Sequence, residues 1–240
     1  MNKVTEVFRH EQKFYVSRGC LEYLDSILSS AMIRDQYTQD IGYLITSIYF
    51  DDHTDSCLID KMDGVREREK YRLRYYERDV NLLKFEIKKK KDDYVLKTSH
   101  SLDGWAVITG RALNVTALRQ TLRERQVFQN PLFFEAFNPV AIVEYHRRAY
   151  YLPYENIRIT IDSDIRSFGY QSGIIHDGHG TQMIPGDLVV LEVKYRSNLP
   201  PYLRDIISSV PARRSAVSKY VLCRQTSQIT RSHDDIAVPR

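Results

Sequence analysis

Several segments of this chain alternate apolar and charged residues with a period of two, and this alternation constrains the fold more than any other feature. Successive side chains of a β-strand point to opposite faces of a sheet, so the period predicts strands with one apolar and one charged face. In EKYRLRYYER, aromatic and aliphatic residues alternate with Lys70, Arg72 and Arg74. The same pattern recurs in EQKFYV, LLKFEIKKKK, NIRITIDSDI and LVVLEVKY. Strands this similar predict a mostly antiparallel sheet.

The charged faces can be read in two ways. For any one strand, the ordinary interpretation is a solvated outer surface. However, Arg72 and Arg74 are neighbours on one face, where like charges repel unless an anion lies between them. Glu192 and Lys194 lie in a strand of large apolar residues, which is typical of the centre of a sheet. Because buried charges must be paired or bind a ligand, we predict an α+β fold: a mostly antiparallel closed β-barrel with a charged interior and helices packed outside.

Four helices are predicted between the strands. SRGCLEYLDSILSSAM begins with Ser17 as a plausible N-cap and repeats leucines at helical spacing. The others are expected around residues 112–127, from Pro201 onward, and around 215–225.

Composition indicates an ordinary globular protein. No Pro, Gly or Ser-rich stretch divides the 240 residues, so a single domain over 1–240 is predicted. No apolar run approaches the roughly 20 residues that span a bilayer, and the N-terminus lacks the apolar centre of a signal peptide, so a cytoplasmic protein is expected. Three widely spaced cysteines argue against a zinc site or disulfide framework. The net charge of +4 is weakly in favour of an anionic partner.

The residue types on the charged faces suit a polyanion. The planar guanidinium of Arg bonds two phosphate oxygens at once, and Lys adds a compact positive charge. A carboxylate is otherwise a poor choice among such cations. We therefore interpret Glu192 as a ligand for a divalent metal bound to phosphate oxygens, with Mg²⁺ or Mn²⁺ as the expected ion.

The order and spacing of these segments resemble a known family. The chain is similar to the catalytic domain of vacuolar transporter chaperone (VTC) polyphosphate polymerases, within the triphosphate tunnel metalloenzyme superfamily. The resemblance covers most of the chain and lies in these segments: RHEQKFYV, TSIYFDD, EKYRLRYY, KFEIKKK, VEYHRRAYY, IRITIDSDI, VLEVKY and SAVSKY.

The resemblance implies roles for particular residues. The expected catalytic residues are Arg72, Arg74, Lys88 and Arg147. The expected phosphate-binding residues are Lys13, Lys97, Arg158, Lys194 and Lys219, and the expected metal ligands are Glu192 and Glu11. For Arg158 and Asp162 two interpretations remain open, as interior residues or as a structural ion pair. Lys89 and Lys91 point to the opposite face from Lys88 and are expected to be solvated.

Two positions depart from the patterns of related proteins. The superfamily's first strand usually reads ExExK, but Arg9 replaces its first Glu here; VTC-like domains share this change, which disfavours a simple tripolyphosphatase. The C-terminal helix of the family has a second Lys three residues before the one matching Lys219, and this chain has Ala216 there. Arg213 and Arg214 are the candidates to replace it.

The resemblance implies a polyphosphate polymerase that transfers the γ-phosphoryl group of ATP to a growing chain, with ATP and polyphosphate as partners. The alternatives are a tunnel triphosphatase that uses water as the acceptor, and a non-catalytic sensor or carrier, which Ala216 keeps open. A nucleic-acid-binding module is the weakest reading, because the basic residues lie on strands and not on one recognition helix. The sequence also leaves open a further protein partner, which it does not identify.

Overall fold

The computed structural model describes residues 2–6, 10–92, 94–110, 112–168, 170 and 180–234. Its main element is a large sheet in which the strand pairs of the described residues are antiparallel. Across the sheet the strands follow the order β1 (Asn2–Glu6), β7 (Tyr94–Ser101), β6 (Asp79–Lys91), β5 (Glu67–Tyr76), β4 (Tyr43–Asp51), β10 (Asn138–Leu152), β11 (Ile157–Phe168), β13 (Leu188–Tyr195), β2 (His10–Ser17) and β14 (Ala212–Arg214).

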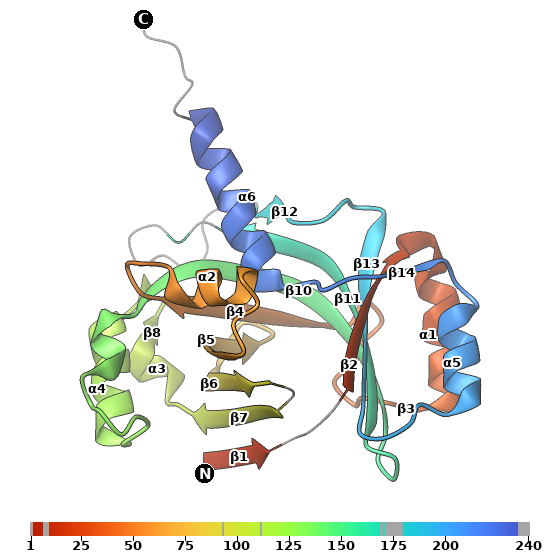
Figure 1. Ribbon diagram of the computed structural model, residues 1–240, viewed down its shortest axis with the longest axis horizontal. Coiled ribbons are helices and arrows are strands. Elements are labelled where there is room, and N and C mark those ends of the chain that lie inside the picture. Colours follow the sequence, from red (N-terminus) through yellow and green to blue (C-terminus); the bar gives the residue numbers. More distant parts are fainter. Residues whose placement is uncertain are drawn as a thin grey trace, which may run out of the picture.

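Shorter strands and helices complete the fold (Figure 1). Strand β3 (Ile33–Arg34) pairs with β10, β12 (Thr181–Gln182) pairs with β11, and β8 (Ile108–Thr109) pairs with β9 (Ala112–Leu113) in a separate hairpin. The helices are η1 (Arg18–Cys20), α1 (Leu21–Ala31), α2 (Ser56–Met62), α3 (Gly104–Val107), α4 (Val115–Glu124), η2 (Phe133–Ala136), α5 (Pro201–Ser208) and α6 (Lys219–Asp234). Among the described residues, no helix is both long and apolar enough to cross a membrane.

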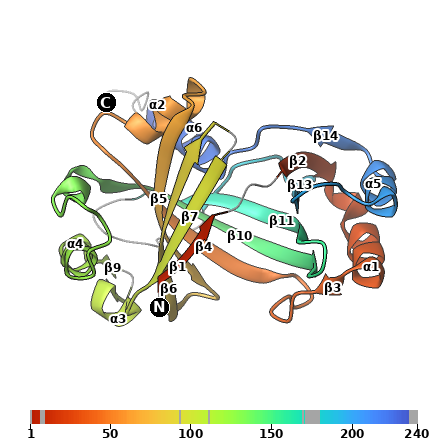
Figure 2. The same ribbon diagram turned by 60° about the horizontal axis from the view of Figure 1, so that its bottom comes forward.

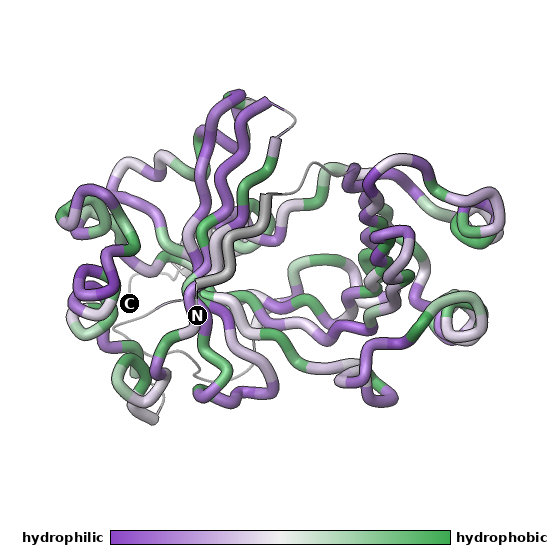
Figure 3. The backbone as a smooth tube through the Cα atoms, turned by 90° about the horizontal axis from the view of Figure 1, so that it is seen from below, coloured by the Kyte–Doolittle hydropathy of each residue, from purple (hydrophilic) through white to green (hydrophobic). Residues whose placement is uncertain are grey.

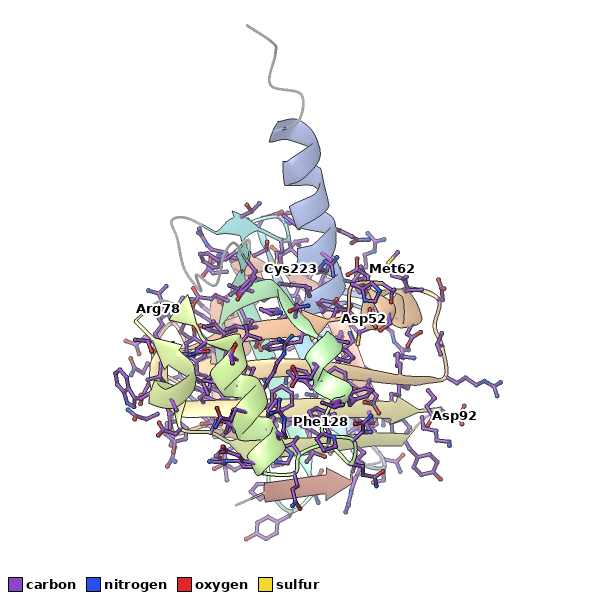
Figure 4. All side chains as sticks on the ribbon, turned by 90° about the vertical axis from the view of Figure 1, so that its left-hand side faces the viewer. Asp52, Met62, Arg78, Asp92, Phe128 and Cys223 are labelled. Carbon is purple, nitrogen blue, oxygen red and sulfur yellow. The ribbon has the colours of Figure 1, made fainter. Side chains whose placement is uncertain are left out.

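The apolar faces of the strands lie on the outside of the curved sheet, beneath the helices. In Figure 2, α1 and α5 pack against one half of the sheet and α3 and α4 against the other. Beneath α1 and α5, Ile159 of β11 and Leu191 of β13 are fully buried. Beneath the opposite helices, Phe85 of β6 packs against Phe128 and Phe134. Figure 4 labels Phe128. The strand periodicity therefore leaves the charged residues on the inner side, which we call the interior face.

The two ends of the sheet approach each other across the interior face. Lys88 of β6 and Glu11 of β2 form an ion pair at 3.5 Å, although several strands separate β6 from β2 in the sheet order. Figure 3 shows hydrophilic and hydrophobic stretches mixed along the strands of the sheet. The antiparallel sheet, the charged interior and the helices outside confirm those parts of the predicted fold.

The predicted closure into a barrel is wrong, because no sheet closes on itself in the described part of the chain. The strand order ends at β1 on one side and at β14 on the other. Strand β1 pairs with β7 while β2 pairs with β13, so these two consecutive strands lie in opposite halves of the sheet. Strand β14 occupies the other edge of β2 between Phe14 and Val16. Periodicity determines which face a residue occupies, but not which strand pairs with a free edge.

The predicted helices are confirmed, with shifted boundaries. Ser17 caps η1, the short turn that leads directly into α1, by accepting a 3.3 Å hydrogen bond from the Gly19 amide, and α6 begins at Lys219. Helix α2 was not predicted, because its N-terminal amides are satisfied by a strand residue: the Asp51 carboxylate accepts from the amides of Cys57 and Leu58 at 2.9 and 3.0 Å. Asp51 also accepts from the Tyr220 hydroxyl, which fixes the start of α6 against β4.

Candidate functional site

The interior face brings charged side chains from seven elements together in linked ion pairs. They belong to β2, β5, β6, β7, β10, β11 and β13, and α6 adds Lys219 at the rim. The contacts form three groups, centred on Glu86, on Asp162, and on the pair Glu11 and Glu192. Of the predicted site residues, Arg158 alone lies apart from these groups.

The first group surrounds the buried carboxylate of Glu86. Arg72 donates to it from Nε and Nη2 at 2.7 Å, Arg74 Nε lies 4.0 Å away, and Lys97 forms a third ion pair. Burial alone would raise the pKa of Glu86, but these three cations hold it below its usual value. Burial lowers the pKa of Lys97 to about 8, against the opposing effect of Glu86. Glu86 thus anchors the guanidinium groups that were predicted to act on phosphate.

The second group surrounds Asp162, which is fully buried on β11. Arg147 of β10 donates to its two oxygens at 2.6 and 2.8 Å, and Lys219 of α6 donates at 2.6 Å. Burial would raise the pKa of Asp162, but Arg147 and Lys219 lower it to about 2. Asp162 is therefore paired with Arg147, and the open alternative of an Arg158–Asp162 ion pair is not realised. Arg158 instead lies 3.7 Å from Asp35.

The third group lies on the neighbouring strands β2 and β13. Glu192 is 2.7 Å from Lys194 and 3.6 Å from Arg147, while Glu11 is 2.8 Å from Lys13. Opposite charges also face each other across the strands, with Glu192 beside Lys13 and Lys194 beside Glu11. Burial would raise the pKa of Glu192, yet Lys194, Lys13 and Arg147 hold it well below its ordinary value. Both carboxylates are thus ionised near neutral pH.

The third group offers carboxylate oxygens as possible ligands for a metal ion. Mg²⁺ and similar hard ions bind oxygen ligands, often through one or two carboxylates completed by substrate phosphates and water. The negative charges of Glu192 and Glu11 repel each other, as expected for two neighbouring carboxylates. The described residues contain no cluster of three or more potential metal-ligating side chains. The two carboxylates therefore fit an ion that arrives with phosphate, and do not by themselves form a complete metal cage.

Tyr145 links the first two groups and was missed by the sequence reasoning. Arg74 donates to its hydroxyl at 3.0 Å, and the ring lies beneath Arg147 and Lys219, with centroid distances of 5.2 and 4.6 Å. Tyr145 lies two residues before Arg147 in VEYHRRAYY, so the period of two predicts that both side chains share one face of the strand. Its role as a common contact of three cations has no sequence signal.

The remaining sequence predictions are met to different degrees. Lys89 and Lys91 lie on the outer face, where they pair with Glu69 and Glu67, which confirms the expectation that they are solvated. Arg213 and Arg214 are both exposed in β14. Arg213 is paired opposite Tyr15, on the same face as Lys13, whereas Arg214 is on the other face. Arg9 lies outside the described residues.

The charges of the interior do not balance. The predicted site contains nine cations, and their carboxylate partners are Glu11, Asp35, Glu86, Asp162 and Glu192. Nine positive and five negative charges leave an excess of four positive charges on one partly enclosed surface. Such an excess raises the local concentration of anions and favours a multiply charged one. The curved sheet and its interior face are thus suited to a polyanionic ligand.

The family follows from comparison with known sequences. The family model of the VTC domain matches residues 8–228, so the chain belongs to the VTC domain family. Among the curated proteins compared with the chain, none matches it.

Solved structures of similar size give weaker matches. The PH1819 protein from Pyrococcus horikoshii OT3 is 13% identical with a TM-score of 0.48, covering 92% of this chain and 98% of that one. A putative adenylate cyclase from Vibrio parahaemolyticus is 9% identical with a TM-score of 0.49, covering 91% and 98%. A putative adenylate cyclase from Bacillus halodurans is 13% identical with a TM-score of 0.41, covering 98% and 95%.

Proposed function

We propose that this protein is a polyphosphate polymerase, which transfers the γ-phosphoryl group of ATP to the end of a growing polyphosphate chain and releases ADP. We further propose that residues 1–240 act as one domain, in the cytoplasm. The observation that supports the reaction most directly is the positive excess of the interior face. A row of cations on several strands can bind the repeated charges of polyphosphate at any chain length.

The reaction would proceed by positioning and charge neutralisation. The terminal phosphate oxygen of the acceptor chain attacks the γ-phosphorus of ATP, and the bond from that phosphorus to the bridging oxygen of ADP breaks. Arg72, Arg74 and Lys88 would neutralise the non-bridging oxygens from one side of the interior, and Arg147 from the other. Because Glu86 and Asp162 hold three of these cations in place before the substrate binds, little reorganisation is required.

A divalent ion, Mn²⁺ or Mg²⁺, would be held by Glu192 and Glu11 together with phosphate oxygens. Bound there, it would offset negative charge on the transferring phosphates. Lys13, Lys97, Lys194 and Lys219 would contact the phosphates on either side of the reacting group. Arg158, more exposed and 3.3 Å from the Tyr43 hydroxyl, would contact phosphates farther from the centre.

Two alternatives use the same interior. With water as the acceptor, the protein would be a triphosphatase acting on tripolyphosphate or a nucleotide. Without turnover, it would be a sensor or carrier, and the replacement of a family lysine by Ala216 is the feature that favours this reading.

Product analysis separates the three functions. We expect purified protein with ATP and Mn²⁺ or Mg²⁺ to release ADP together with long-chain polyphosphate and little free phosphate, and Glu192→Gln to abolish both products. Free phosphate without polymer would indicate the triphosphatase, and polyphosphate binding with no ADP release would indicate the sensor. Either result would contradict the polymerase. Lys89→Met, on the outer face of β6, is the matched control and should behave as the wild type.

A further inference from the structure

A small cavity lies beside the interior face, between the end of α2 and the segment that leads into α6. Its volume is about 240 Å³, and it is lined by Tyr15, Lys61, Met62, Val221, Leu222 and residues 215–218. Figure 4 shows Met62 at the end of α2, near the start of α6. The cavity is several times the roughly 30 Å³ that one water occupies in the liquid, so a phosphate group can enter it.

The segment 215–218 separates this cavity from the interior and contacts both. Ser218 lines the cavity, and its hydroxyl accepts a 3.2 Å hydrogen bond from Lys70 of β5. On the interior side, Lys13 donates to the Val217 carbonyl at 3.2 Å. Lys70 occupies the same face of β5 as Arg72 and Arg74, two and four residues away. The segment that lines the cavity is thus bonded directly to two of the interior lysines, Lys70 and Lys13.

The surroundings of Lys70 are strongly positive. The charged groups that face it come from every adjacent element: Lys61 of α2, Arg68 of β5, Lys88 of β6 and Lys13 of β2. From α6 it is approached by the Tyr220 ring, with Nζ 5.4 Å from the centroid. Within the described residues, Lys70 forms no ion pair with a carboxylate. The acidic residues of β5, Glu67 and Glu69, lie on the opposite face and pair with Lys91 and Lys89.

We propose that Lys70, Lys61 and Ser218 form a further anion-binding subsite, which holds a phosphate group of polyphosphate where the chain passes between the interior and the surface. The inference rests on the proposed function, since a polyanion must already occupy the interior. An anion between Lys61 and Lys70 replaces their mutual repulsion by attraction to a common partner. The Ser218 hydroxyl, which accepts from Lys70, can rotate to donate to a phosphate oxygen.

Binding at this subsite takes up a proton. Burial and the charges of Lys61, Lys88 and Lys13 lower the pKa of Lys70 to about 7, so the amine is mostly neutral at pH 8. A bound phosphate favours the charged form and raises that pKa again. Protonation therefore accompanies binding, and affinity for polyphosphate falls as pH rises from about 7 to 9.

Calorimetry of the full chain with long-chain inorganic polyphosphate tests the subsite. Titrations at pH 8 in two buffers of different ionisation enthalpy give the number of protons taken up. We expect Lys70→Arg, which is always charged, to bind at least as tightly as wild type at pH 8 but to take up about 0.5–0.9 fewer protons at the Lys70 position. We expect Lys70→Met to weaken binding about tenfold. Lys89→Met should match the wild type in both measurements.

The outcomes separate this inference from the proposed function. If wild type binds no polyphosphate, the proposed function is overturned and the subsite with it. If wild type binds, and Lys70→Met binds equally well, or Lys70→Arg takes up as many protons as wild type, the subsite alone is overturned. Thermal unfolding confirms that each variant is folded. If Lys70→Met is not folded, Lys70→Arg still provides a test.

Discussion

Replacing Arg72 with alanine is expected to lower polyphosphate synthesis by about 1,000-fold or more. A guanidinium that neutralises a transferring phosphoryl group contributes about three to five orders of magnitude to turnover. The fold should survive, because Glu86 keeps an ion pair with Lys97 and remains 4.0 Å from Arg74. Initial rates of ADP release and polymer formation at saturating ATP and metal measure the effect.

Arg72→Lys is the informative companion variant. Lysine retains the charge but lacks the planar fork, so we expect it to recover a small part of the lost activity. If Arg72→Ala remained within tenfold of wild type while its thermal unfolding was unchanged, Arg72 would have no direct contact with the reacting phosphates. The role assigned to the Glu86 group would then be wrong.

Replacing Asp162 with asparagine is expected to lower the free energy of unfolding at pH 7 by about 3–5 kcal/mol. Asp162 is fully buried, and its loss leaves Arg147 and Lys219 without their shared carboxylate; breaking a buried ion pair typically has a cost of this size. Urea unfolding followed by circular dichroism measures the difference. The matched control is Glu67→Gln, whose exposed 3.7 Å pair with Lys91 should contribute less than about 1 kcal/mol.

The effect of Asp162 should also depend on pH in a defined direction. Its pKa is lowered in the folded protein from 3.8 to about 2. The stability linked to this shift is therefore fully present above about pH 4 and is lost as pH falls toward 2. The difference between wild type and Asp162→Asn should narrow over that interval. A difference that stayed constant down to pH 2 would mean that the carboxylate is not held by its charged partners.

Much of the interior could be predicted because strand periodicity is a local property. Once Leu73 and Phe85 are assigned to a core, Arg72, Arg74, Glu86 and Lys88 must share the other face. The helical segment from Ser17 was equally predictable, since Ser17 caps η1 and the leucines of α1 follow directly in the chain. These features depend only on residues a few positions apart.

Features that depend on long-range pairing could not be predicted. Asp162 pairs with Arg147 because β10 and β11 place them in register, and Lys219 joins them because α6 is held by Asp51. The free edge of β2 is taken by β14, which no pattern in the short segment ARR indicates. The low pKa of Lys70 likewise arises from burial and from cations on three other elements, which only the fold brings together.

The most direct test of the central claim is a crystal structure of the protein with inorganic tripolyphosphate. The account predicts phosphates on the interior face, within hydrogen-bond distance of Arg72, Arg74 and Arg147. Phosphates bound only at the outer lysines, such as Lys89 and Lys91, with the interior ion pairs undisturbed, would contradict it.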